Sequence, residues 1–544
     1  MRDAEYSVRH LSKVEMHTSD GVTLSSEIYL PKGLERVPTI LVRLPLPKWW
    51  KNQVRLNIIG EAWAARGYAV VYQGTRGSYR SGGDLYPLVP ERKDGVETLQ
   101  WLARQPWYDG RIGMWGGSAF GHTQWVLWDQ VDPGISAYAI QIASTDFHGM
   151  FHPGGAFSFE SALYWALRSS RREEYVPSDA TLQAGYGGLP VIEADERAER
   201  DIKFFNEWAS HRDKDEYWRQ IDGENRAREL AAPVHMLAGW FDAFLPTQLD
   251  DFMELQKHGD PEMARRSRLV IGPWGHANNV DLPGDFEAPD YRMTSINIAI
   301  PWFDKHLLGR EVPPSAPVRI FVMGVNEWRD EESWPLARAV PTSFHLRAEG
   351  RLTLEPPPQS ESFDSYDYDP SDPVPSTGGS MLGPRSGIEI QNEIEARPDV
   401  LVYTTEPLTE EIEISGPITL VLYVSTTAVS TDFTGKLVDV HPSGDAYNIT
   451  DGILRRTYAQ TDSDASEPDP TRVEVELWPT SIVLLRGHRL RIEISSSNFP
   501  RYDRNPNTGR PIVTETETVI AHQRIYHHRD AASHVVLPLV PEEL

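Results

Sequence analysis

The stretch Ile112-Gly-Met-Trp-Gly-Gly-Ser-Ala-Phe-Gly121 decides the fold prediction, because it joins a strand, a tight turn and a helix. Ile112 to Trp115 has the apolar character of a buried strand, and residues 122–130 have helical spacing. Between them, glycines surround Ser118. Small neighbours let the backbone turn sharply and leave a serine hydroxyl exposed at the start of the helix. The stretch therefore predicts a strand–turn–helix element with Ser118 at the turn.

Strands and helices alternate on both sides of this element. A hairpin is expected over residues 15–29, with Ser19-Asp20-Gly21 as its turn. Further strands are expected over residues 38–43, 69–73, 234–238 and 267–271, and helices over residues 58–65, 94–104 and 296–308. Such alternation predicts a mainly parallel sheet with helices on both faces.

Two other regions break this rhythm. Residues 146–229 carry charged, aromatic-rich helical stretches, which favours an inserted helical cap. After a Pro-rich link, short Val-, Ile- and Thr-rich runs begin at residues 318–323, which is typical of a β-sandwich or jelly roll. Residues 355–387 are rich in Pro, Ser and Asp and are expected to form an extended surface excursion. The predicted domains are a core (1–145 and 230–315), a cap (146–229) and a jelly roll (316–544).

Composition excludes several classes of protein. The 544 residues carry a net charge of −26, which disfavours binding to nucleic acid or to an anionic membrane. The absence of cysteine removes disulfides, thiolate metal sites and a cysteine nucleophile. No signal-peptide-like or membrane-spanning apolar run is evident, so a cytoplasmic protein is expected. The sequence leaves open whether the chain forms a homo-oligomer.

Two later segments give Ser118 chemical partners. Asp242 in Ala238-Gly-Trp-Phe-Asp-Ala243 and His276 in Ile271-Gly-Pro-Trp-Gly-His-Ala277 each follow a predicted strand, where sites collect in open α/β sheets. The order Ser, Asp, His is that of the α/β-hydrolase fold. Histidine can accept the serine proton, and the carboxylate can hold the imidazole tautomer. The N–H of Ala119 is a candidate oxyanion donor at the helix start.

The sequence also resembles the CocE/NonD hydrolases, the family of bacterial cocaine esterase, which is related to S15-type Xaa-Pro dipeptidyl peptidases and α-amino-acid ester hydrolases. The resemblance covers nearly the whole chain. Its motifs are Val42-Arg-Leu-Pro45, Gln73-Gly-Thr-Arg-Gly77, residues 105–118, Gly121-His-Thr-Gln-Trp125, Ala238-Gly-Trp-Phe-Asp242, Gly272-Pro-Trp-Gly-His276, Ser430-Thr-Asp-Phe433, Val438-Asp-Val440 and Gly452-Ile-Leu-Arg455. It implies an α/β-hydrolase core, a helical cap and a C-terminal jelly roll, with the active site where they meet. The family's triad falls on Ser118, Asp242 and His276.

One departure from the family pattern concerns the oxyanion. The family usually has Tyr after the Pro of this R-x-P-Y loop, whereas Leu46 follows Pro45 here. A leucine side chain donates no hydrogen bond. The backbone N–H of Leu46 or a neighbour, the side chain of Lys48, or an indole of Trp49 or Trp50 are candidate substitutes. The remaining alternative is a site built for another substrate.

Several side chains are candidates for lining the substrate site, namely Phe147, Phe151, Trp240, Phe241 and His122. Ordinary packing of the cap and of the turn is the alternative for each. His527-His528 is interpreted as a solvated strand pair, and no metal site or cofactor is expected.

The leading functional hypothesis is a cofactor-free serine esterase or amidase acting on a small ester or amide. A dipeptidyl- or aminoacyl-type peptidase is the first alternative, and it needs carboxylates for the substrate ammonium group. Glu160, Glu173 and Glu174 are the candidates. The second alternative is a degenerate hydrolase retained as a ligand-binding protein, which only Leu46 favours.

Overall fold

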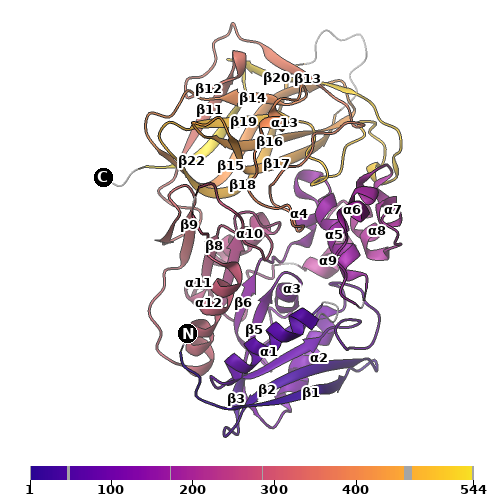
Figure 1. Ribbon diagram of the computed structural model, residues 1–544, viewed down its shortest axis with the longest axis vertical. Coiled ribbons are helices and arrows are strands. Elements are labelled where there is room, and N and C mark those ends of the chain that lie inside the picture. Colours follow the sequence, from indigo (N-terminus) through magenta and orange to yellow (C-terminus); the bar gives the residue numbers. More distant parts are fainter. Residues whose placement is uncertain are drawn as a thin grey trace.

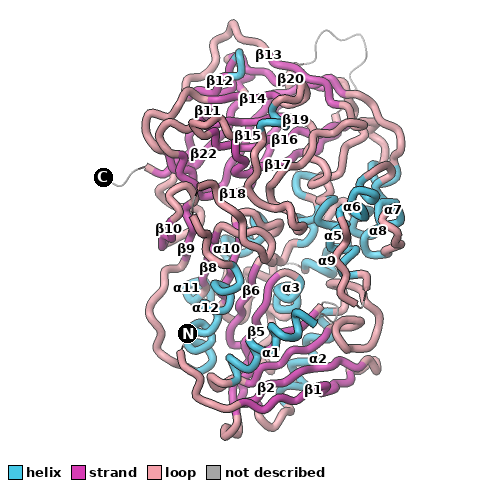
Figure 2. Tube along the Cα trace, viewed as in Figure 1, coloured by secondary structure: helices cyan, strands magenta, loops and turns pink. Residues whose placement is uncertain are grey.

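The computed structural model describes residues 2–45, 50–171, 173–223, 225–284, 286–458 and 469–541, with the backbone alone for residues 50–56. The molecule is elongated (Figure 1). An α/β domain lies at one end, a β domain at the other, and a group of helices lies beside their junction. Figure 2 shows that the helices lie mainly in the α/β domain and in the group of helices beside the junction, whereas the β domain consists mainly of strands and loops. No helix among the described residues is long and apolar enough to cross a membrane.

A mixed sheet of 10 strands, counted within the described residues, forms the first domain. Its order is β1-β2-β4-β3-β5-β6-β7-β8-β9-β10, with β3 to β9 parallel to one another and antiparallel strands at both ends. The strands are β1 (Val8–His17), β2 (Thr23–Pro31), β3 (Val37–Leu44), β4 (Ala69–Gly74), β5 (Tyr108–Gly117), β6 (Ile135–Gln141), β7 (Val234–Gly239), β8 (Arg268–Gly272), β9 (Val318–Val322) and β10 (Glu327–Glu331). The expected hairpin at the start of the chain is confirmed by the pairing of β1 with β2.

One strand was assigned to the wrong sheet. We predicted that the run beginning at Val318 would open the jelly roll, but β9 pairs in parallel with β8 and so extends the first sheet. The sheet therefore continues to Glu331. An apolar run after a Pro-rich link is compatible with either sheet, because the run itself does not specify its partner strand.

Helices cover both faces of this sheet. They are α1 (Trp50–Ala64), α2 (Glu91–Ala103), α3 (Ala119–Trp125), α10 (Leu245–His258), α11 (Pro261–Arg266) and α12 (Tyr291–Leu308). Ile40 and Val42 of β3 share a buried cluster with residues of α1 and α12. Leu41 between them joins the opposite cluster, with residues of α2, α3 and α10. A strand buried on both faces in this way is continuously apolar, as the sequence indicated.

The predicted cap is a set of short helices between β6 and β7. They are α4 (Phe147–Phe151), η1 (Pro153–Gly155), α5 (Phe159–Ser169), α6 (Asp179–Tyr186), η2 (Val191–Glu193), α7 (Ala194–Arg197), α8 (Lys203–Ser210) and α9 (Glu216–Asp222). Their apolar faces form one aromatic-rich core that also includes Ala243 and Phe244 of the first domain. The cap is thus packed onto the loop that follows β7.

The C-terminal domain is an antiparallel β-sandwich. Its elements are β11 (Val340–Arg347), η3 (Ala348–Gly350), β12 (Arg351–Thr353), β13 (Phe363–Tyr368), α13 (Asn392–Glu395), β14 (Leu401–Thr404), β15 (Ile412–Thr426), β16 (Ser430–Val440), β17 (Ala446–Thr457), β18 (Thr471–Leu484), β19 (Arg489–Ser495), η4 (Ile512–Thr514), β20 (Ala521–His528), β21 (Ala531–Ala532) and β22 (His534–Val540). The long strand β15 is interrupted by an irregularity between Gly416 and Ile418.

Residues 355–387 are not only a surface excursion. They contain β13, which pairs with β20, and they bury Tyr366, Tyr368 and Met381. Proline, serine and aspartate are favoured in loops, but they do not exclude a short strand whose alternate residues are aromatic and buried.

A buried ion-pair group joins the cap to the sandwich. The Asp503 carboxylate lies 2.9 Å from Arg455 and 3.3 Å from Arg212 of the cap, and it also accepts the N–H of Phe157 at 2.7 Å. Burial raises the pKa of Asp503, but the two guanidinium groups outweigh this and lower it overall. The charge is therefore compensated at the junction of cap and sandwich.

Candidate active site

Ser118 lies at the sharp turn between β5 and α3. Its backbone has φ 57° and ψ −130°, a conformation that non-glycine residues rarely adopt. The turn is held by a hydrogen bond from the Ser118 N–H to the carbonyl of Gln141, at 2.9 Å. Strain of this kind persists only where the surrounding structure imposes it, and it is typical of a nucleophile elbow.

The glycines of the turn are required by close packing. A Cβ on Gly116 would lie 2.5 Å from the Cβ of Phe120, and one on Gly121 would lie 2.4 Å from the Cβ of Ala143. Because Gly116 and Phe120 face each other, a large side chain is accommodated at residue 120 when residue 116 has none. The common nucleophile-elbow pattern G-x-S-x-G has a glycine two residues after the serine. The space at Gly116 explains how this turn forms with Phe120 at that position instead.

Ser118, His276 and Asp242 lie in one hydrogen-bonded line. The His276 Nε2 is 2.8 Å from the Ser118 Oγ, and its Nδ1 is 2.6 Å from the Asp242 Oδ2. Asp242 is fully buried, and its other carboxylate oxygen accepts the N–H of Phe244 at 2.8 Å. The His276 side chain keeps 13% of its surface exposed. The three residues that the sequence placed after separate strands are therefore brought together.

Trp274 fixes the two loops that carry Asp242 and His276. Its carbonyl accepts the N–H of Phe241 at 2.9 Å. A Cβ on Gly239 would lie 2.3 Å from that carbonyl, and one on Gly272 would lie 2.2 Å from the Trp274 ring. The glycines at the ends of β7 and β8 thus let the two loops approach each other closely enough for the imidazole–carboxylate contact.

A polar group beneath the turn was not found by sequence reasoning. The Gln141 side-chain oxygen accepts hydrogen bonds from the Tyr291 hydroxyl at 3.2 Å and from the Ser295 hydroxyl at 2.7 Å. Burial, followed by the Asp242 charge, raises the pKa of Tyr291. These residues support the turn from α12, and nothing in their spacing along the chain distinguishes them from ordinary helix residues.

A row of aromatic rings leads from the imidazole into the cap. The ring centroid of Phe244 is 5.8 Å from that of His276 and 5.1 Å from that of Phe147. Phe147 and Phe151 both contact Trp165. Phe244 was missed, although its position two residues after Asp242 was the signal that could have identified it. Phe147 is one ring away from His276, and its role in binding substrate stays a prediction.

The other three residues predicted to line the substrate site have mainly structural contacts. His122 is fully buried, its Nε2 lies 3.1 Å from the carbonyl of Leu88, and burial lowers its pKa to about 3. Trp240 donates its indole N–H to the carbonyl of Phe321, at 2.8 Å. Phe241 is 1% exposed in the core of the first domain. These contacts favour packing as the role of all three.

Of the two oxyanion candidates, Ala119 lies within the described residues and Leu46 lies outside them. Ala119 is the first residue of α3, where backbone N–H groups have no acceptor within the helix. Leu46, Lys48 and Trp49 lie outside the described residues, as does the side chain of Trp50.

The motif residues next to this loop have defined partners. Arg43 is fully buried, with Nη1 3.0 Å from the Glu91 carboxylate and 2.7 Å from the Glu91 carbonyl. Arg76 binds the Asp94 carboxylate through two nitrogens, at 2.6 and 2.7 Å. The two arginines of the resembling motifs therefore tie the end of β3 and the loop after β4 to α2.

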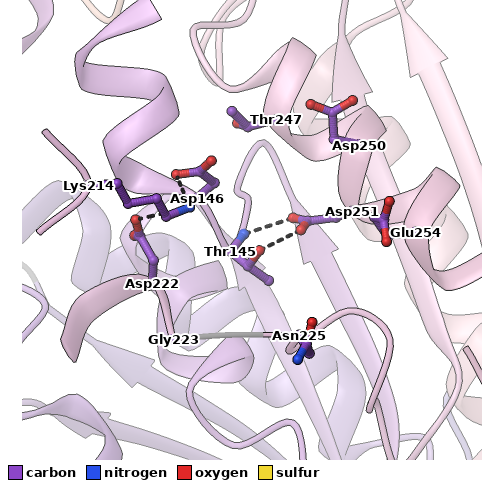
Figure 3. Close-up of a pocket in the computed structure, with 10 residues that line it drawn as sticks. All are labelled: Thr145, Asp146, Lys214, Asp222, Gly223, Asn225, Thr247, Asp250, Asp251 and Glu254. Carbon is purple, nitrogen blue, oxygen red and sulfur yellow. Dashed lines mark hydrogen bonds and ion pairs between the residues drawn. The ribbon is translucent and has the colours of Figure 1, made fainter. Parts of the chain in front are cut away.

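A pocket of about 340 Å³ lies between the cap and α10, and it contains none of the three aligned residues (Figure 3). Lys214 points toward Asp146 and Asp222, at 3.1 and 3.9 Å. The lining residues are Thr145, Asp146, Lys214, Asp222, Gly223, Asn225, Thr247, Asp250, Asp251 and Glu254. Asp222 also accepts the N–H of Phe147 at 2.8 Å. The pocket wall thereby holds the start of α4, which carries the aromatic row.

Asp251 makes stability depend on pH. It accepts hydrogen bonds from the Thr145 N–H and hydroxyl, at 2.7 and 2.6 Å, yet burial raises its pKa to about 7. An unfolded aspartate titrates near ~3.9. Between these values the folded chain retains a proton that the unfolded chain has released. The contribution of Asp251 to the free energy of unfolding is therefore expected to fall as pH rises from about 4 to about 7.

We expect Asp251→Asn to remove this decrease in the free energy of unfolding, because an amide cannot ionise. Between pH 5 and pH 8, the free energy of unfolding of the variant should rise relative to wild type by on the order of 2 kcal/mol. Urea unfolding of both proteins at the two pH values measures this difference. A difference that does not change with pH contradicts the assignment.

The strained serine, the imidazole and the buried carboxylate at the carboxyl ends of β5, β8 and β7 have the arrangement of an α/β-hydrolase site. The chain is a serine hydrolase built on this fold. The X-Pro dipeptidyl-peptidase (S15 family) profile matches residues 20–278, and the profile of the X-Pro dipeptidyl-peptidase C-terminal non-catalytic domain matches residues 311–536. The chain belongs to the CocE/NonD family of S15-type hydrolases.

Individual relatives extend over the whole chain. A cocaine esterase from Rhodococcus sp. (strain MB1 Bresler) is 37% identical over 592 aligned positions, which cover 99% of this chain and 100% of the relative. An aminopeptidase from a marine sediment archaeon, Thaumarchaeota archaeon, is 26% identical, with a TM-score of 0.82 and coverage of 99% and 97%. An α-amino acid ester hydrolase with 24% identity and a TM-score of 0.83 covers 99% of this chain and 98% of its own, and supports the fold.

The interpretation of His527 as a solvated residue was wrong. Its side chain is 3% exposed, and its Nε2 lies 3.1 Å from the Asp364 carboxylate. Burial lowers the pKa of His527, but the Asp364 contact outweighs it and raises the pKa overall. Alternation along β20 turns His527 inward against β13, a pairing that the sequence of the strand alone does not reveal.

Proposed function

We propose that the chain hydrolyses small carboxylic esters or amides through an acyl-enzyme intermediate on Ser118. The observation that carries the proposal is the unbroken line from the Ser118 Oγ through both nitrogens of His276 to the buried Asp242, with contacts of 2.8 and 2.6 Å. A serine hydroxyl is a weak nucleophile at neutral pH, and an imidazole within hydrogen-bond reach removes that limitation.

Each step uses groups that this line provides. The Ser118 oxygen attacks the substrate carbonyl while His276 Nε2 takes the hydroxyl proton. The N–H of Ala119 stabilises the resulting oxyanion. His276 then returns the proton to the leaving alcohol or amine as the carbonyl–heteroatom bond breaks. Water, deprotonated by His276, hydrolyses the acyl-serine and regenerates Ser118. Asp242 holds the imidazole tautomer and stabilises the imidazolium throughout.

Two considerations favour esters over peptides. A relative that covers the full chain is named for ester hydrolysis. A dipeptidyl or aminoacyl peptidase must also bind an ammonium group, and among the described residues none of the three acidic candidates has a hydrogen bond or ion pair with Ser118, His276 or Asp242. The Glu160 carboxylate packs against the backbone of Gly383 in the sandwich, whereas Glu173 and Glu174 are exposed.

The substrate class is tested by comparing kcat/KM for p-nitrophenyl butyrate with that for Gly-Pro-p-nitroanilide and alanine-p-nitroanilide. We expect the butyrate ester to be preferred by at least about 10²-fold, with an initial burst of p-nitrophenol if deacylation is the slower step. Preferential cleavage of either free-amine substrate contradicts esterase specificity and supports the peptidase alternative. In that case the chain must bind the substrate ammonium group close to Ser118.

A further inference from the structure

Two histidines and an aspartate converge at one edge of the sandwich, far along the chain from the proposed catalytic residues. Asp439 lies near the end of β16, His441 lies just beyond that strand, and His488 immediately precedes β19. One ligand-type atom from each lies within 4.8 Å of the others. Asp439 and His488 are 49 positions apart, so no short sequence motif announces the group.

The spacing of these atoms suits a metal ion. The His488 Nδ1 is 2.8 Å from one Asp439 oxygen, and the His441 Nε2 is 3.3 Å from the other. Around a tetrahedral Zn²⁺ with bonds of about 2.0–2.1 Å, neighbouring ligand atoms are separated by about 3.3 Å. The two imidazole ring centroids are 4.3 Å apart. Small side-chain rotations therefore suffice to direct all three ligand atoms at one ion.

The charge balance also suits a cation. The Asp439 carboxylate keeps only 9% of its surface exposed, and among the described residues its ion-pair contacts are these two imidazoles. A bound cation would place a full positive charge beside this buried carboxylate. Carboxylate and imidazole are common zinc ligands, and three protein ligands leave a position for water. His441 is 27% exposed and provides the solvent side of the group.

The backbone holds the ligands rigidly. Asp439 is paired with Tyr447 of β17 and with Leu490 of β19. The His441 N–H donates to the carbonyl of Asp445 at 2.9 Å, which closes the β16–β17 turn. The His488 carbonyl accepts the N–H of Leu408 at 2.8 Å. Ligands placed on paired strands and closed turns lose little further freedom on binding.

We infer that Asp439, His441 and His488 form a binding site for a divalent first-row cation of the Zn²⁺ type. The ion joins the β16–β17 turn to the start of β19, and it stabilises this edge of the sandwich. It stands apart from the proposed hydrolytic chemistry, which needs no metal.

The test uses the full-length, tag-free chain, stripped with EDTA and titrated with ZnCl₂ by isothermal calorimetry. His441→Asn removes one ligand at a partly exposed position. His522→Asn is the matched control, because His522 is 64% exposed and contacts a single carboxylate, Asp367, in the same domain. We expect one Zn²⁺ per chain in wild type and in His522→Asn, and affinity at least tenfold weaker in His441→Asn. Circular dichroism establishes that each variant is folded.

Thermal unfolding supplies a second measurement. Zinc at 100 times its Kd should raise the unfolding midpoint of wild type and of His522→Asn, because an ion that binds only the folded state stabilises it. The midpoint of His441→Asn should rise much less. Equal zinc affinity in wild type and His441→Asn, or no binding by wild type up to millimolar zinc, overturns the inference.

Discussion

Replacing Ser118 with alanine is expected to lower kcat/KM for an aryl ester by about 10⁴-fold or more while leaving the fold unchanged. The alanine removes the oxygen that is 2.8 Å from His276 Nε2, and no acyl-enzyme can then form. The turn itself is set by backbone contacts, including the bond from the Ser118 N–H to Gln141, which alanine preserves. Steady-state hydrolysis of p-nitrophenyl butyrate and circular dichroism measure the two effects.

Ser333→Ala is the control, because the Ser333 hydroxyl donates to the carbonyl of Pro335, outside the aligned residues. Its activity should stay within about twofold of wild type. If Ser118→Ala retains wild-type kcat/KM, the nucleophile is another residue and the proposed mechanism is wrong.

Replacing Asp242 with asparagine should lower kcat by about 10⁴-fold. The carboxylate accepts from the Nδ1 of His276 at 2.6 Å, which leaves Nε2 free to take the serine proton. An amide that donates to Nδ1 stabilises the opposite tautomer, whose Nε2 carries a proton. The volume and the acceptor for the Phe244 N–H are nearly conserved, so the structure should be retained.

Asp251→Asn provides a matched comparison, since it makes the same chemical change at a buried aspartate on α10 that does not contact His276. Its kcat should stay within about tenfold of wild type. Similar losses in both variants would mean that Asp242 acts through general packing rather than through the imidazole.

Much of this site follows from local sequence signals. The turn at Ser118 was predictable because only small neighbours allow a strand to pass directly into a helix. Asp242 and His276 were predictable because each follows an apolar strand-like run, and parallel strands deliver their carboxyl ends to one edge. The helical cap was evident from the loss of strand signals after residue 145.

Features that depend on distant partners were not predictable in this way. β9 was assigned to the sandwich because its own residues do not specify that it pairs with β8. His527 was judged solvated because the strand that covers it, β13, lies in a segment whose composition suggested a loop. Asp439 and His488 meet only through the pairing of β16 with β19. In each case the information resides in strand pairing rather than in local composition.

The central claim, that Ser118 is an activated nucleophile in the native site, is tested most directly by covalent labelling. The folded chain is treated with a small alkyl fluorophosphonate, in which the serine oxygen displaces fluoride from phosphorus. Intact mass and peptide mapping then locate the product. The account predicts one adduct per chain, on Ser118, and none in Ser118→Ala. An adduct on a different serine, or no adduct on a chain that circular dichroism shows to be folded, would contradict it.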